Sequence, residues 1–276
     1  HFRSMDIWQS ASESKQYINT GWLGRYLDAQ CATCRVPTMA LEVDDALSLA
    51  LKGEKAKALA IKNVRRLYRI SNEKFLRQLS QSHQMLHPVE PADYLYKTMA
   101  DAISGADYIY KQSGLAINSS AYPKTEIGNS LKTIASLICS DINTKVYYLS
   151  IGSFDTHVGQ DGKQQKLFSE INDAIESFVK DLKSNRRFED VMLMTFSEFG
   201  RRVAENASYG TDHGTANNMF FISGALKKSG LINEMPDLGK LIDGDIQHTV
   251  DFKDVYATLL NKWLGADDEQ MLGKHY

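Results

Sequence analysis

The chain has 276 residues, of which 43% are hydrophobic and 24% charged, a composition that excludes a disordered or fibrous protein. Its 32 basic and 34 acidic residues give a net charge of −2, so it lacks the positive field that nucleic-acid binding needs. Its apolar runs are far shorter than the roughly 18 residues of a membrane-spanning helix. We therefore expect one domain over residues 1–276, with no nucleic-acid partner and no transmembrane segment.

Cysteine and histidine pairs in the first third of the chain give weak signals. Cys31 and Cys34 form one C-x-x-C pair without a second, which is more typical of two thiols or a local disulfide than of a zinc site. His83 and His87 stand four residues apart, but no acidic residue is spaced as in H-E-x-x-H. We expect a capping or surface role for these histidines.

The chain up to residue 140 is predicted to be mostly helical, because apolar residues recur there at helical spacing. The expected helices span residues 17–29, 64–79, 91–105 and 127–140. No Pro/Gly/Ser-rich linker and no internal repeat interrupts this part.

The pattern changes after residue 144. Residues 145–151 are β-branched and aromatic, which predicts a strand buried on both faces. A helix over 164–183 and strands over 191–196 and 219–222 follow, and a crossover of this length predicts a right-handed parallel βαβ unit. With a last helix over 252–264, the sequence predicts an α/β fold with a mostly parallel central sheet.

Polar clusters follow the first two of these strands, and a third precedes the next one. The candidate metal ligands in them are Asp155, His157, Glu198, Asp212 and His213. Binding groups gather at the carboxyl ends of parallel strands, so we expect these side chains to lie together. Carboxylate and imidazole suit zinc, manganese or iron(II), and such an ion polarises a phosphoryl, sulfuryl or acyl oxygen. Alternatively, the same residues form turns, since Asp bonds its own backbone there.

Arg201 and Arg202 follow Glu198 at the same edge. A guanidinium pairs well with two oxygens of a phosphate or sulfate, although Arg beside Glu is also the pattern of a solvated ion pair. Arg201 is the stronger candidate for a ligand contact. The sequence has no G-x-G-x-x-G, Walker or G-x-S-x-G motif, so a nucleotide cofactor and the α/β-hydrolase mechanism lack support.

Several motifs in order along nearly the whole chain resemble one family. They are HF at 1–2 with IWQ at 7–9, GWLGRYLD at 21–28, FDTH at 154–157 with Gln160, SEFGR at 197–201 with Asn206, GTDHG at 210–214, and DF at 251–252 with VYATLL at 255–260. Together they look like the bacterial family DUF1501. That family is similar to the alkaline phosphatase and sulfatase superfamily, which implies a three-layer α/β/α sandwich and metal-dependent transfer of phosphoryl or sulfuryl groups.

The resemblance implies metal ligands in two alignments. In both, Asp155 and His157 look like the Asp and His that hold a metal after a central strand. In one, residues 212–214 are similar to the superfamily's Asp-His-Gly motif. In the other, slightly favoured because it keeps strand order, Glu198 takes the place of that Asp, Phe199 replaces its His, and His213 is a later ligand. The second metal site is then impaired, because Phe199 cannot ligate.

The resemblance also concerns the start of the chain. Superfamily enzymes carry an early Asp and a Ser, Thr or Cys nucleophile, and similar family members often place this region after a twin-arginine signal. His1-Phe2 resembles the point just after it, and no Ser or Thr here matches the nucleophile. We therefore expect a chain that lacks its N-terminal strand and nucleophile region, from a family whose members are exported to the bacterial periplasm, although no signal is present in this sequence.

These observations predict a metal-dependent hydrolase of a small phosphate or sulfate ester, which is inactive in this form if the nucleophile region is missing. Asp155, His157 and His213 are the expected core ligands, and Glu198 and Asp212 are further ligands or orient them. Arg201 or Asn206 is expected to bind the ester oxygens. Zinc or manganese is the expected ion, with calcium or magnesium as alternatives. The alternative function is a non-catalytic binding or scaffold domain with the same fold.

Overall fold

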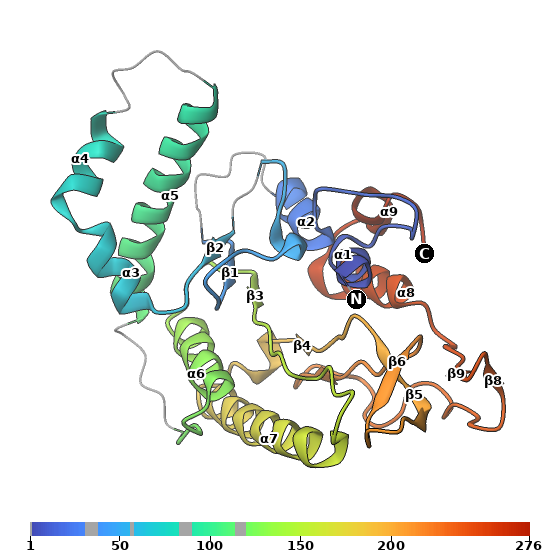
Figure 1. Cartoon of the computed structure of the whole chain (residues 1–276). Helices are drawn as coiled ribbons and strands as arrows, with labels where there is room; N and C mark the ends of the chain where they lie inside the picture. Colours follow the sequence, from blue (N-terminus) through green and yellow to red (C-terminus); the bar gives the residue numbers. More distant parts are fainter. Residues whose placement is uncertain (1, 31–37, 56–57, 83–89, 114–119) are drawn as a thin grey trace.

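The computed structural model describes residues 2–30, 38–55, 58–82, 90–113 and 120–276, which form a mixed α/β fold (Figure 1). The helices are α1 (Phe2–Ser10), α2 (Trp22–Gln30), α3 (Val64–Ser71), α4 (Lys74–Ser82), α5 (Glu90–Ser113), α6 (Glu126–Cys139), α7 (Gln160–Ser184), α8 (Phe252–Leu259) and α9 (Asp268–Leu272), with single turns at Leu49–Leu51, Phe188–Asp190 and, as a π-helix, Leu260–Leu264. The strands are β1 (Ala40–Glu42), β2 (Leu59–Ala60), β3 (Val146–Tyr148), β4 (Leu193–Met194), β5 (Gly200–Glu205), β6 (Thr211–Gly214), β7 (Phe221–Ile222), β8 (Leu241–Ile242) and β9 (Asp245–Ile246).

The expected helices are confirmed, with shifted ends. The helix expected over 127–140 is α6, whose N-cap Thr125 accepts a hydrogen bond from the Gly128 amide. The helix expected over 64–79 is divided into α3 and α4, because Asn72 caps the end of α3. The last helix continues past α8 as a π-helical turn that ends at Gly265. No described helix is long and apolar enough to cross a membrane.

The parallel sheet has the order β2-β1-β3, with Leu41 of β1 opposite Leu59 on one side and Tyr147 on the other. The strand expected over 145–151 is therefore present as β3. The prediction that it is buried on both faces is wrong in degree, since all three of its residues are only partly buried, although each face packs against an apolar core. Its position at the edge of the three-stranded sheet explains the exposure.

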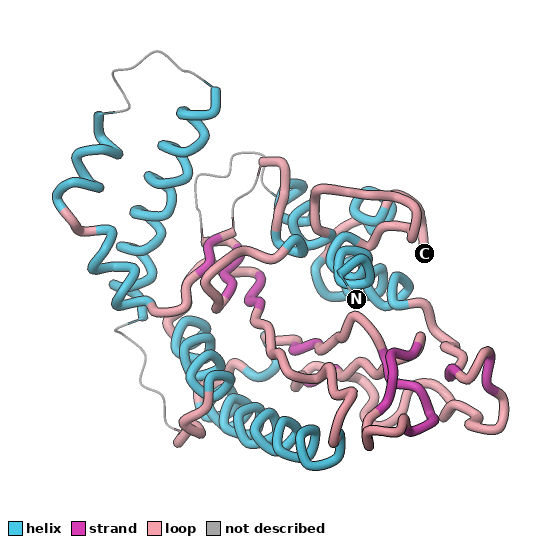
Figure 2. The backbone as a smooth tube through the Cα atoms, in the orientation of Figure 1, coloured by secondary structure: helices cyan, strands magenta, loops and turns pink. Residues whose placement is uncertain are grey.

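The predicted parallel unit joining 145–151 to 191–196 is also wrong. In the described chain β3 pairs with β1, while β4 pairs antiparallel with β7, with Leu193 opposite Ile222. One edge of β3 pairs with residues 40–42, a strand too short for its periodicity to be recognised. Figure 2 shows the resulting separate small sheets among the helices.

Helices pack on both faces of β3. Val146 and Tyr148 contact a core built mainly by α2, α8 and α9, with Leu27 and Tyr256 at its centre. Tyr147 and Leu149 point the other way, toward the core between α6 and α7. Figure 1 shows these helix groups on opposite sides of the strand. This packing fixes the loop that leaves β3, which carries the candidate site.

Candidate metal site

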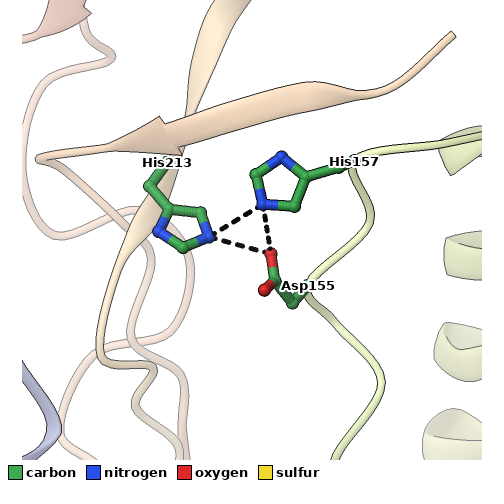
Figure 3. Close-up of side chains that lie close together, drawn as sticks. All are labelled: Asp155, His157 and His213. Atoms are coloured by element: carbon green, nitrogen blue, oxygen red, sulfur yellow. Dashed lines mark hydrogen bonds and ion pairs between the residues drawn. The ribbon is translucent and has the colours of Figure 1, made fainter. Parts of the chain in front are cut away.

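Three candidate ligands from two separate parts of the chain meet at one point (Figure 3). Asp155 and His157 lie in the loop between β3 and α7, and His213 lies on β6. Oδ1 of Asp155 is 2.8 Å from Nε2 of His157 and 2.8 Å from Nε2 of His213. The two imidazole Nε2 atoms are 3.1 Å apart. The prediction that these side chains lie together is therefore confirmed for these three residues.

The β5–β6 hairpin brings His213 to the loop. The two strands pair antiparallel with His213 opposite Arg201, and the register shifts between Arg201 and Glu205. The hairpin turn also contacts the end of the loop. There the Gly159 amide donates to the Ser208 carbonyl at 3.0 Å, and the Gln160 amide donates to the Tyr209 carbonyl at 2.8 Å. Two segments some 50 residues apart in sequence are thus joined by backbone hydrogen bonds beside the ligands.

Asp155 lies in a positive environment. Its Oδ1 accepts hydrogen bonds from His213 and, at 3.0 Å, from Nη2 of Arg201. The hydrogen bond with His213 is the main cause that lowers the pKa of the Asp155 carboxyl, and the nearby guanidinium of Arg201 adds to it. Its side chain is 47% exposed, so the ionised carboxylate faces solvent as well as its partners.

Asp212 takes a supporting position. Its Oδ1 lies 3.2 Å from Nδ1 of His157, on the side of the ring away from Asp155. A carboxylate on one ring nitrogen fixes the proton there and leaves the other nitrogen free to ligate. Asp212 is therefore placed to hold the ring of His157, and it lies outside the three-residue group of candidate ligands.

Arg201 holds the loop and the hairpin together. Nη1 donates to the Thr211 carbonyl at 2.8 Å, and Nη2 donates to the Phe154 carbonyl at 2.7 Å as well as to Asp155. Its side chain is only 16% exposed. Its expected contact with ester oxygens stays a prediction, and its observed bonds are to the protein.

Asn206 is likewise bonded to the protein. Its Oδ1 accepts from the amides of Ser208 and Gly210, and its Nδ2 donates to the His157 carbonyl at 3.0 Å. This is the pattern of an Asn that shapes a turn. The ester contact expected for Asn206 also stays a prediction.

Glu198 and Phe199 precede β5. The backbone carbonyl of Glu198 accepts a hydrogen bond from the Ser4 hydroxyl of α1, and its carboxylate is not part of the three-ligand group. Phe199 stacks on His213, with ring centroids 3.8 Å apart and an interplanar angle of 13°. Phe199, which replaces a ligand in one of the two alignments, thus packs against the candidate ligand His213. A role of Glu198 as a ligand stays a prediction.

Sequence reasoning missed the side chains that join the two halves of the site. Gln160 accepts hydrogen bonds from two buried threonines, Thr156 and Thr211. Threonines directly next to candidate ligands in both motifs were the available signal. The weaker candidates Cys31–Cys34 and His83–His87 lie outside the described residues.

The fold and the cluster define a mixed α/β protein with a candidate site of two histidines and an aspartate. The family model described as "Protein of unknown function (DUF1501)" matches residues 1–276. The chain therefore belongs to the DUF1501 family, as its motifs predicted. No curated protein and no solved structure matches it.

Proposed function

We propose that this chain is a metal-dependent hydrolase domain that acts on a small phosphate or sulfate ester, built on a three-layer α/β/α sandwich of the alkaline phosphatase and sulfatase type. The observation that carries the proposal is the meeting of Asp155 Oδ1 with Nε2 of His157 and of His213, at separations of 2.8 to 3.1 Å. The packing of helices on both faces of β3 supports the layered architecture.

The donor set fits one divalent ion. Tetrahedral zinc binds His nitrogen and carboxylate oxygen at about 2.0–2.2 Å, so donors around one ion lie about 3.3–3.6 Å apart, and these three donors would separate by a few tenths of an ångström to admit it. Two imidazoles with one carboxylate favour zinc or manganese over calcium or magnesium, which prefer oxygen ligands. Three protein ligands also leave a further position open, as in catalytic zinc sites. A bound ion would supply the positive charge that polarises a phosphoryl or sulfuryl oxygen.

The chain's own residues prepare this site. Asp212 holds the ring of His157, and Arg201 holds the carboxylate of Asp155. The side chains of Asp155, His157 and His213 are 47%, 43% and 33% exposed, so a substrate from solvent can reach them. Preorganised ligands of this kind need little rearrangement when an ion and a substrate bind.

A second candidate function is a domain that binds a metal or ligand without catalysis. The observation that favours it is the state of Arg201 and Asn206, whose side chains are hydrogen-bonded to backbone groups of the loop and the hairpin. Under this alternative the chain retains metal affinity and has no turnover.

Two measurements on the purified chain separate these functions. Metal-free protein is titrated with Zn²⁺ and with Mn²⁺ by calorimetry, and the loaded protein is assayed on aryl phosphates and aryl sulfates. Ion binding with ester hydrolysis supports the hydrolase. Ion binding without hydrolysis of either ester class favours the binding domain, and absence of ion binding contradicts the metal site.

A further inference from the structure

We infer that Gln160, the first residue of α7, is a positioning residue that sets the relative placement of the two halves of the metal site. The inference rests on the proposed metal binding. One half of the site is the loop with Asp155 and His157, and the other is the hairpin with His213. A side chain that joins both halves controls whether the three donors can meet.

The contacts of Gln160 join these halves directly. Its Oε1 accepts from Thr156 Oγ1 at 3.0 Å and from Thr211 Oγ1 at 2.8 Å. Thr156 stands between Asp155 and His157 in the chain, and Thr211 directly precedes Asp212. One amide oxygen therefore joins the segments that supply all three ligands.

Burial makes this link sensitive to change. Thr156 is 2% and Thr211 is 8% exposed, so their hydroxyls have little access to water. Thr156 Oγ1 also accepts a hydrogen bond from Nε2 of Gln164, one turn further along α7. Removing the Gln160 acceptor would take away the acceptor of the buried Thr211 hydroxyl and leave Thr156 only the Phe154 carbonyl at 3.4 Å, so the segments would have to move to restore these hydrogen bonds.

The position of Gln160 in α7 makes the link rigid. Its backbone amide donates to the Tyr209 carbonyl at 2.8 Å, so backbone and side chain both hold the hairpin. The helix itself is fixed by its core contacts with α6 through Ala174, Phe178 and Leu182. The first turn of α7 thus serves as the fixed support against which loop and hairpin are placed.

Three variants test the inference. Gln160→Met keeps the length of the side chain and removes the acceptor, while Gln160→Glu keeps an acceptor at the same place. Gln165→Ala is the matched control, because Gln165 is an exposed residue of the same helix. Affinity is measured by calorimetry with Zn²⁺, and ligand geometry by the visible absorption spectrum of the Co²⁺-loaded protein.

We expect Gln160→Met to bind Zn²⁺ about 10- to 100-fold more weakly than the wild type and to show an altered Co²⁺ spectrum. Gln160→Glu should restore most of the affinity and the spectrum, and Gln165→Ala should match the wild type. A Gln160→Met chain with wild-type affinity and spectrum would overturn the inference alone. A wild-type chain that binds neither ion would overturn the proposed function as well.

Far-ultraviolet circular dichroism shows whether Gln160→Met is folded. If it is not, a further variant takes its place in the test. Thr211→Val removes the other end of the link and should weaken Zn²⁺ binding to a similar degree. A variant with both Gln160→Met and Thr211→Val should lose no more Zn²⁺ affinity than either single variant, because both substitutions remove the same link. Fully additive losses would overturn the inference.

Discussion

His157 has the most demanding position in the site, because both of its ring nitrogens have partners. Nδ1 faces Asp212 at 3.2 Å, while Nε2 lies 2.8 Å from Asp155 and 3.1 Å from Nε2 of His213. Two imidazole nitrogens this close to one carboxylate oxygen form a site for a proton or a metal ion. The partner on Nδ1 favours the tautomer whose Nε2 lone pair faces the other ligands.

Asp212 is expected to strengthen metal binding by holding the ring of His157. Asp212→Asn removes the carboxylate from His157 Nδ1 and should weaken Zn²⁺ binding by about 10- to 100-fold, since partners behind metal-ligating histidines typically contribute that much. Calorimetric titration measures the change. Asp161→Asn, at an exposed site in the first turn of α7, serves as the control. Equal affinities of Asp212→Asn and the wild type would show that Asp212 does not orient His157.

How far the site could be predicted depends on the kind of residue. The meeting of Asp155, His157 and His213 was predicted from residue type and from their places near strands. Gln160 was not assigned a role, because its residue type is not that of a typical metal ligand. Its role comes from two long-range hydrogen bonds, and such contacts appear only once the chain is folded.

Among the elements, the junction between the loop after β3 and the β5–β6 hairpin leaves no room for a side chain at Gly210. A Cβ atom there would lie 2.3 Å from the carbonyl group of His157, which is backbone and cannot rotate away. The glycine is therefore required by close approach of two backbones next to the ligands.

Gly210→Ala should destabilise the fold by about 1–3 kcal/mol, the usual cost of forcing extra volume into a filled site, and should weaken ion binding because His157 must shift. Chemical denaturation and Zn²⁺ titration measure the two effects. Gly162→Ala is the matched control: it lies in α7 with open space at its Cβ, and should raise stability by about 0.5–1 kcal/mol. A Gly210→Ala variant as stable as the wild type would contradict this account of the junction.

The elements also show where sequence patterns fail. Helices such as α6 and α7 have local hydrogen bonds and an apolar face of many residues, so their periodicity predicts them well. Strand pairing depends on residues far apart in the chain. The partner of β3 is the three-residue β1, more than 100 residues earlier, and β4 pairs with β7 in the antiparallel sense. Segments of two or three residues carry too little pattern to predict such pairings.

For the molecule as a whole, the two ends of the chain are packed together. Trp8 stacks on Phe252 with ring centroids 4.1 Å apart, and Trp22 stacks on Tyr256 at 4.2 Å. The Tyr256 hydroxyl donates to the Trp8 carbonyl at 3.0 Å. This core supports α1, whose Ser4 bonds the segment before β5. Global stability and the site are therefore linked through α1.

Asp268 makes the unfolding free energy of the chain depend on pH. Its side chain is 4% exposed and accepts hydrogen bonds from the Tyr276 amide and from Asn261, each at 3.0 Å. The Tyr276 amide is the main cause that lowers the pKa of Asp268 to about 2. Because the folded chain favours the ionised form, this contribution is fully present above pH 4 and is lost as the pH falls toward 2.

Asp268→Asn should therefore cost about 2 kcal/mol of unfolding free energy at pH 7 and progressively less between pH 4 and pH 2. Urea denaturation of wild type and variant at several pH values measures the difference, with the exposed Asp243→Asn as control. A difference that stays constant from pH 7 to pH 2 would show that the Asp268 carboxylate is not the cause.

In the proposed metal site, Asp155, His157 and His213 hold one divalent ion. The most direct test of this site is the calorimetric titration of metal-free protein with Zn²⁺, for the wild type and for His213→Ala, with circular dichroism to confirm that both are folded. We expect one ion per chain in the wild type and loss of this binding in His213→Ala. No binding by the wild type, or the same affinity and stoichiometry in both proteins, would contradict the proposed site.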